Sequence, residues 1–142
     1  MGKVVLANRL KIGEVAHLSG LSVKTIRYYA DIGLLTPTVE RSRNGYRLFD
    51  AQVLKRLAFI KRAQLLGLSL EEIKPLLEQY DRGQLPCPDV KQQIETKLQA
   101  IASQIEALKT RQIELQAILE LWQDVPSIHL LSQTICPNIE VK

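Results

Sequence analysis

The fold is decided by residues 11–35, KIGEVAHLSGLSVKTIRYYADIGLL. Apolar residues recur every three or four positions along this stretch, which predicts two short helices. Gly20 suits the end of the first helix, Ser22 is a good N-cap for the second, and Gly33 suits the position just after the second. Ile26 and Tyr29 lie one turn apart on the second helix, so both can face the first. Two short helices joined by a few residues with a glycine in the turn form a helix-turn-helix.

The next stretch, TPTVERSRNGYRLFD at residues 36–50, predicts a β-hairpin. Asn44-Gly45 is a strong hairpin signal, and strand-forming residues stand on both sides of it. Three arginines lie at or near the tip of the hairpin: Arg41, Arg43 and Arg47. A cationic hairpin beside a helix-turn-helix is a wing, so we expect a winged-helix module.

Two further helices are predicted before the first linker. Asp50 is expected to cap the third helix, and Ser69 and Glu72 have capping-box spacing at the start of the fourth. The third helix has an apolar stripe made of Val53, Leu54, Leu57, Ile60 and Leu65. We therefore expect residues 1–80 to form one winged-helix DNA-binding domain.

A long helix is predicted after a linker at residues 81–87. Pro88 suits its first position, with Cys87 as the cap, and no glycine or proline interrupts residues 89–123. The apolar residues step by three and four in a heptad register: Ile94, Leu98, Ile101, Ile105, Leu108, Leu115, Leu119 and Trp122. Such a sustained seam predicts a coiled-coil dimer over residues 88–123. The alternative is a helix packed on its own domain, but that domain is too small to cover about 50 Å of helix.

The charge of the chain is split between its two halves. Residues 1–66 carry twelve Lys/Arg and four Asp/Glu, whereas residues 67–142 carry seven and eleven. A strongly basic half is the electrostatic footprint of a nucleic-acid-binding module, although chance clustering on solvated faces gives the same count. We find no 18-residue apolar run and no signal peptide, so we expect a cytoplasmic protein without a membrane partner. The absence of a nucleophile–base pair, a phosphate loop or a paired-acid pocket argues against an enzyme.

Three blocks of the sequence resemble the MerR family of transcriptional regulators. They are residues 11–35, RSRNGYRLFD at 41–50, and LKRLAFIKRAQLLGLSLEEIKPLL at 54–77, with Ala30 departing from the acidic residue that is common there. The resemblance implies a mainly α fold: a winged helix-turn-helix with a small β-hairpin wing, then a long antiparallel coiled-coil helix. It also implies a homodimer on double-stranded operator DNA. The effector-bound dimer would distort the promoter so that RNA polymerase can engage it.

Seven residues of the second helix and the wing are predicted to contact DNA: Lys24, Arg27, Tyr28, Arg43, Asn44, Tyr46 and Arg47. Arg27 can reach a guanine edge or a phosphate, and Tyr28 can offer its hydroxyl to a phosphate. Adjacent residues cannot share a helix face, so we expect Tyr29 in the core and Tyr28 on DNA. The alternative for a wing arginine is a solvated tip. Most of these contacts would position the protein without specifying sequence.

The two cysteines of the chain, Cys87 and Cys136, are candidate metal ligands. In the MerR family, a cysteine at the start of the dimerisation helix marks sensors of soft divalent metals such as mercury, zinc, cadmium and lead. CPNIE, at residues 136–140, resembles the family's metal-loop cysteine. An antiparallel dimer would bring Cys87 of one subunit near the other subunit's C-terminal segment, residues 124–142. The predicted site therefore joins Cys87 to the partner's Cys136, with His129 as a weaker candidate. Trp122 stands where mercury and zinc sensors have a further cysteine, which leaves the metal open.

Three functions fit these observations. The first is a metal-responsive regulator, and the second is the same DNA-binding module responding to a small molecule or a redox signal. The third is a coiled-coil adaptor whose basic residues are incidental, which the helix-turn-helix and wing disfavour. The alternative to metal sensing for the two cysteines is that Cys87 is a helix cap and Cys136 a buried small hydrophobic residue.

Overall fold

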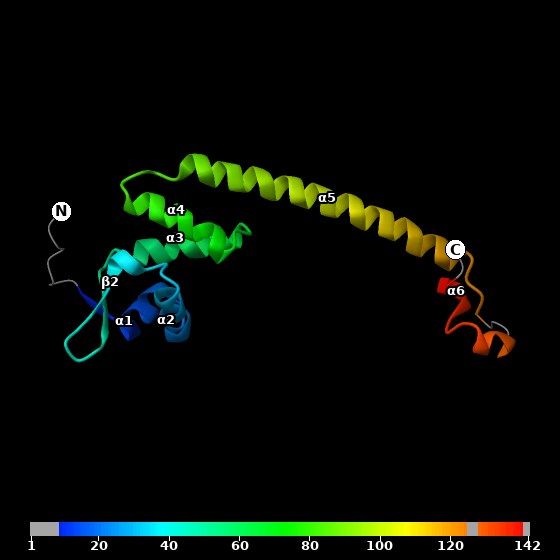
Figure 1. Cartoon of the computed structure of the whole chain (residues 1–142), viewed down its shortest axis with the longest axis horizontal. Coiled ribbons are helices and arrows are strands. Elements are labelled where there is room, and N and C mark those ends of the chain that lie inside the picture. The colour runs from blue at the N-terminus through cyan, green and yellow to red at the C-terminus, as the bar shows by residue number, and fades with distance from the viewer. Residues whose placement is uncertain (1–8, 125–127, 141–142) are drawn as a thin grey trace. The chain divides into compact units, whose positions relative to one another are not determined.

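A computed structural model of the chain describes residues 9–124 and 128–140, and it divides into two compact units, residues 1–95 and 96–142. The elements of the first unit run in the order β1(Leu10–Lys11), α1(Ile12–Ser19), α2(Val23–Asp31), η2(Thr36–Thr38), β2(Val39–Arg41), β3(Arg47–Phe49), α3(Val53–Leu65) and α4(Leu70–Asp81). They are followed by α5(Cys87–Glu120), η3(Ile128–Ser132) and α6(Pro137–Glu140). The mainly helical fold class expected from the sequence is confirmed (Figure 1).

The wing is part of a three-stranded sheet, not an isolated hairpin. The antiparallel order is β1-β3-β2, and Phe49 of β3 stands opposite Leu10 on one side and Val39 on the other. The sequence analysis missed β1 because two residues are too few to show an alternating pattern. This third strand joins the chain before α1 to the wing.

A single hydrophobic core holds the N-terminal unit together. Figure 1 shows α3 running between α4 and the pair α1–α2, and α3 packs against both α1 and α4. The core side chains are Val15, Ile26, Tyr29, Leu34, Leu35, Phe49, Val53, Leu57, Ile60, Ala63, Leu68, Ile73, Leu76 and Leu77. One member of the expected α3 stripe was wrong: Leu65 is 71% exposed, and Ala63 takes the core position in the last turn.

The helix ends follow the expected capping chemistry at Gly20, Ser22, Gly33 and Ser69, but not at Asp50 or Cys87. Ser22 accepts a hydrogen bond from the backbone N–H of Thr25 at 3.0 Å, and Ser69 forms a capping box with Glu72. Gly33 follows α2 with φ +86°, a left-handed conformation that glycine adopts without a Cβ penalty. Asp50 does not cap α3 directly. Its carboxylate accepts from the N–H of Gln52, in a turn that precedes the helix by two residues.

The long helix α5 is present, with boundaries that differ slightly from expectation. It begins at Cys87, not Pro88, and ends at Glu120, so the non-helical segment before it is 82–86. The N–H of Val90 donates to the carbonyl of Pro86 at 2.9 Å, which places Cys87 inside the first turn and not at the cap. The structure describes every residue of α5, and none of its side chains is buried.

The second unit has local order that periodicity did not reveal. The Asn138 side chain forms a two-point clamp on the backbone of Gln123: its Oδ1 accepts from the Gln123 N–H at 2.9 Å, and its Nδ2 donates to the Gln123 carbonyl at 3.0 Å. This clamp attaches α6 to the segment that follows α5. Residues 125–127 and 141–142 of the expected C-terminal segment lie outside the described residues.

Candidate nucleic-acid interface

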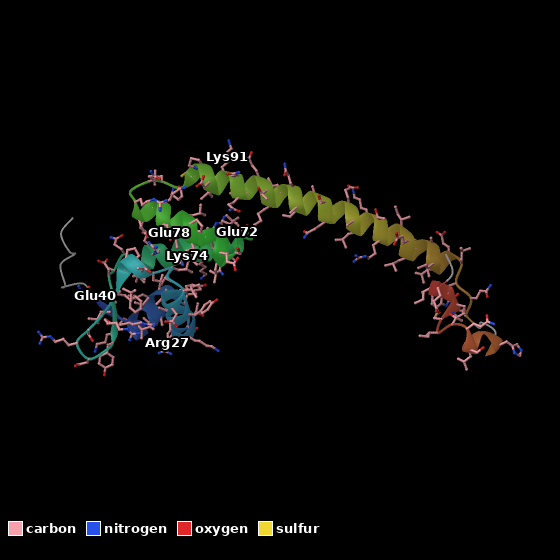
Figure 2. The ribbon with its side chains drawn as sticks, in the orientation of Figure 1. Arg27, Glu40, Glu72, Lys74, Glu78 and Lys91 are labelled. Atoms are coloured by element: carbon pink, nitrogen blue, oxygen red, sulfur yellow. The ribbon has the colours of Figure 1, made fainter. Side chains whose placement is uncertain are left out.

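The two adjacent tyrosines of α2 lie in opposite environments, as expected. Tyr29 is 7% exposed, and its hydroxyl donates to Oε1 of Gln64 on α3 at 3.0 Å. Burial raises the pKa of Tyr29, and the hydrogen bond that its hydroxyl donates to Gln64 lowers it in part. Tyr28 is 52% exposed, so its phenol is available to a partner. Arg27, labelled on α2 in Figure 2, is exposed as well. Helix α2, the recognition helix expected from the sequence, therefore presents adjacent cationic and phenolic groups on its solvent side.

The wing ends in a tight turn that holds its polar tip outward. The N–H of Gly45 donates to the carbonyl of Ser42 at 3.0 Å, which places Arg43 and Asn44 at the two central positions of the turn. Gly45 then adopts φ +83°, so the loop is a turn followed by a left-handed glycine, one of the common hairpin connections. The Asn44-Gly45 signal thus found the hairpin, although the turn is centred one residue earlier. Arg43 and Asn44 are exposed, and Tyr46 is 68% exposed.

Two of the wing arginines make contacts within the domain. The guanidinium of Arg47 forms an ion pair with Asp31 and donates to the backbone carbonyl of Arg27 at 3.2 Å. Arg47 therefore joins strand β3 to the C-terminal half of α2. Arg41 donates from Nη1 to the carbonyl of Gly45 at 2.9 Å and so stabilises the turn of the wing. The Arg47 contacts fix the position of the wing relative to α2, whereas the Arg41 contact stabilises the wing itself.

The exposed residues expected to contact DNA come from two elements of one unit. Lys24, Arg27 and Tyr28 are exposed on α2, and Arg43, Asn44 and Tyr46 are exposed on the wing. Glu40 of the wing, labelled in Figure 2, forms an ion pair with Arg9, the residue immediately before β1. This ion pair neutralises one of the acidic groups of the wing. The result is a polar, cationic surface on the helix and hairpin that can follow a phosphate backbone.

The expected metal ligands lie in different units. Cys87 is an exposed free thiol in the first turn of α5, and Cys136 is a half-buried free thiol immediately before α6. His129 lies in η3 and is exposed. In the part of the chain that the structure describes, no three His, Cys, Asp or Glu side chains are grouped as ligands of one ion.

The sequence analysis missed the carboxylate that organises the surroundings of Cys136. Glu140 accepts hydrogen bonds from the N–H of Cys136 at 2.7 Å and of Ile135 at 3.0 Å, and from the hydroxyl of Thr134. These bonds, led by that of Thr134, lower the pKa of Glu140. The signal was the four-residue spacing between Cys136 and a carboxylate able to reach back to its amide.

Family models match nearly the whole described chain. The model of the MerR HTH family regulatory proteins matches residues 10–80, and the model described as MerR, DNA binding matches residues 54–126. The chain belongs to the MerR family. MerR proteins are DNA-binding regulators, so this agrees with the expectation of a transcriptional regulator and not an enzyme.

Relatives of the chain are named as regulators, and the name of one refers to mercury. The mercuric resistance operon regulatory protein of Bacillus cereus is 39% identical over 93% of this chain and 96% of its own length. The HTH-type transcriptional regulator HmrR of Rhizobium leguminosarum is 40% identical over 92% of this chain and 95% of its own. These likenesses extend through α5 and beyond the winged-helix domain.

Solved structures of MerR regulators have the same fold. The regulator PbrR691 from Ralstonia metallidurans in complex with lead(II) has a TM-score of 0.71 and 30% identity, over 83% of this chain and 91% of its own. HiNmlR, a MerR family regulator lacking the sensor domain, bound to promoter DNA, has a TM-score of 0.52 and 28% identity, over 79% and 88%. Among the residues that our structure describes, none of the helices is both long and apolar enough to span a membrane.

Proposed function

We propose that the chain is a metal-responsive transcriptional regulator that binds operator DNA as a homodimer and takes up a soft metal ion between its subunits. The observation that carries the DNA-binding part is the exposed pair Arg27 and Tyr28 on α2, next to a wing whose tip is also cationic. Arg47 fixes the distance between these two surfaces through its contacts with Asp31 and the Arg27 carbonyl. A pre-positioned helix and wing can contact neighbouring parts of one duplex without reorganisation.

The homodimer is supported by the exposure of the heptad seam. Ile94 is 38% exposed and Leu98 61%, and the same holds along the helix to Leu119 at 69%. An apolar stripe of this length is costly in water, and a second copy of α5 offers a matching one. In an antiparallel pair, the start of each helix would lie beside the end of the other.

The intersubunit metal site follows from the length of α5 and the chemistry of its ends. Cys87 and Glu120 are the two ends of one continuous helix of 34 residues, about 50 Å long at roughly 1.5 Å per residue. We therefore pair Cys87 with Cys136 of the partner subunit. Thiolates are soft donors, so this donor set suits a soft cation.

Mercury(II) is the metal that this donor set fits best. Two thiolates complete a linear two-coordinate site, whereas zinc requires four ligands and would need His129, Asp124 or water in addition. The names of the mercuric resistance regulator and the lead(II) complex of PbrR691 support a metal over a small-molecule or redox effector. Binding would tie the C-terminal segment of one subunit to the start of α5 of the other. A metal-induced shift in their relative position would alter the promoter DNA that RNA polymerase meets.

Mixed dimers test the site. A Cys87→Ser chain paired with a Cys136→Ser chain should keep one complete mercury(II) site per dimer and lose the other. Homodimers of either variant should bind at neither. Stoichiometry is measured on the reduced protein by titration against a competing thiol. If either homodimer retains full stoichiometry and affinity, the intersubunit pairing is wrong. A Ser132→Ala homodimer, altered at an exposed residue of the same segment, is the control and should bind like the wild type.

A further inference from the structure

The last turn of α4 makes three side-chain contacts with its two neighbouring helices, α3 and α5. Gln79 donates to the carboxylate of Asp89 in the first turns of α5. Tyr80 accepts from Nζ of Lys55 on α3 at 2.9 Å, and the same ammonium lies 5.1 Å from the centre of the Tyr80 ring. Asp81 pairs with Arg56, also on α3. Three consecutive residues thus connect α4 to both of its neighbours.

Arg56 extends this connection to the recognition helix. Its guanidinium forms a fork on Asp81, with Nη1–Oδ1 at 2.6 Å and Nη2–Oδ2 at 2.9 Å, and its Nε donates to the carbonyl of Leu34. The N–H of Leu34 in turn donates to the carbonyl of Tyr29 at 3.0 Å, which closes the C-terminal end of α2. One buried guanidinium therefore holds the end of the recognition helix and the end of α4 at a fixed separation.

A buried ion pair contributes little net stability, because removing both charges from water costs free energy that offsets their attraction. Arg56 is 7% exposed, and it is the one charged side chain buried among the residues that the structure describes. Well-packed apolar residues in place of a buried ion pair are often as stable or more so. What a bidentate fork adds is a fixed geometry, because both parallel hydrogen bonds are lost when either partner tilts.

The segment between α4 and α5 is short and irregular, so side-chain contacts set the relative position of the two helices. Only residues 82–86 separate the two helices, and Gly83 among them adopts φ +84°. Across this segment, the Gln79–Asp89 hydrogen bond joins the two helices directly, and Val90 packs against the core of the N-terminal unit. Because of these contacts, a displacement of the first turn of α5, where Cys87 lies, would also displace the last turn of α4.

We infer that the last turn of α4 couples the effector site to the recognition helix, with Gln79 and Arg56 as positioning residues. The path runs from Cys87 in the first turn of α5 through Asp89 and Gln79 to Asp81. From there it runs through Arg56 to Leu34 and the end of α2. The inference rests on the proposed function, because it assumes that metal at Cys87 displaces the start of α5. Neither Gln79 nor Arg56 contacts metal or DNA in this scheme.

The test breaks the surface part of the path, which the fold does not need. Gln79→Ala and Asp89→Ala remove the same hydrogen bond at the edge of the domain, and Lys91→Ala changes an exposed side chain two residues further along α5 (Figure 2). Each full-length dimer is bound to a duplex selected with the wild-type protein and carrying one dye at each end. Energy transfer between the dyes then reports DNA bending before and after mercury(II) is added. Mercury(II) stoichiometry, duplex affinity without metal and thermal unfolding are measured on the same samples.

We expect both path variants to bind mercury(II) and duplex like the wild type, while the metal-dependent bending equilibrium shifts by roughly two- to thirtyfold less. The double variant should equal either single variant, because the two changes act on one bond. Lys91→Ala should respond fully. Arg56→Lys, which keeps the charge but cannot make all three contacts, should reduce the response at least as much as Gln79→Ala does if it folds.

A full bending response in both Gln79→Ala and Asp89→Ala would overturn the coupling path. A lower unfolding temperature with an unchanged bending response would also overturn it, since that is the result of a purely structural role. A wild-type dimer that neither binds mercury(II) nor changes the DNA would overturn the proposed function, and with it the coupling. These failures are distinguishable because the first two require a responding wild-type protein.

Discussion

Tyr28 and Tyr29 are neighbours in the chain, with ring centroids 6.3 Å apart and ring planes inclined by 49°, yet one faces solvent and the other the core. The helix imposes this division, because successive residues are rotated by about 100° around its axis. Tyr29 uses its hydroxyl within the domain, on Gln64. Tyr28 keeps its hydroxyl for a partner.

The two tyrosines should respond oppositely to loss of the hydroxyl. Tyr29→Phe removes the bond to Gln64 and should lower the free energy of unfolding by about 1 kcal/mol, with little effect on DNA affinity. Tyr28→Phe should leave stability unchanged and weaken operator binding by roughly tenfold, if its hydroxyl donates to a phosphate. Urea unfolding and a duplex-binding titration on both variants separate the two effects. Equal stability losses in both would contradict the assignment.

The raised pKa of Tyr29 predicts a dependence of stability on alkaline pH. A phenol whose pKa is higher in the folded state than in the unfolded state stabilises the fold at pH values below the unfolded-state pKa, about 10. That stabilisation should be lost as the pH rises through the folded-state value. The difference in unfolding free energy between wild type and Tyr29→Phe, followed from neutral to alkaline pH, measures it. A difference that does not change with pH would show that Tyr29 titrates alike in both states.

The wing and the recognition helix should differ in how they depend on DNA sequence. Arg43→Ala should weaken binding to all duplexes about equally and reduce the slope of log affinity against log salt by about one unit, as expected for one lost phosphate contact. Arg27→Ala should weaken operator binding by about 1–3 kcal/mol and relax preference at one base pair, if the guanidinium reads a guanine. Lys97→Ala, on α5, is the matched removal of a positive charge outside this surface. If Arg43→Ala leaves the salt slope unchanged, the wing does not contact the backbone.

The seam of α5 should hold the dimer. Leu108→Glu together with Leu115→Glu would place charged carboxylates in the apolar seam of the dimer. This double variant should be monomeric and should no longer bind operator DNA. Glutamate at both Ser103 and Thr110, which lie on the opposite side of the heptad, is the control and should leave the dimer intact. Sedimentation velocity reports the mass of each. A dimer that survives the Leu108 and Leu115 changes would place the interface elsewhere.

The carboxylate of Glu140 should make the order around Cys136 dependent on acidic pH. Its folded-state pKa is lowered, so its contribution is present above the unfolded-state value and is lost as the pH falls through the folded one. Hydrogen exchange of the Ile135 and Cys136 amides should therefore gain an acid-dependent increase beyond the intrinsic rate. Glu140→Ala should show fast exchange at every pH, whereas Glu114→Ala, on α5, should behave like the wild type. Slow exchange in Glu140→Ala would show that other contacts protect these amides.

The sequence identified most of the DNA-binding fold because its signals are local. Ser22, Gly33 and the Ser69–Glu72 pair cap helices through bonds that span only a few residues, so residue type and spacing are sufficient to find them. The Asn44-Gly45 pair located the wing in the same way. Leu65 was misassigned because the apolar stripe of a helix does not show which of its positions the neighbouring elements cover: Leu65 is exposed, whereas Ala63 in the same turn is buried.

The sequence alone determined helices α1 to α5, the wing, the apolar seam of α5 and the family, because each depends on periodicity or on short motifs. Only the tertiary structure decided which polar groups meet across the chain. Arg56 and Asp81 are 25 residues apart, Arg47 and Asp31 are 16 apart, and Asn138 reaches Gln123 across 15. Nothing in the local pattern pairs these residues, since each pairing depends on how helices and strands pack around one core. The physical reason is that capping and periodicity act within a turn or two of backbone, whereas ion pairs and side-chain clamps require two surfaces that folding alone brings together.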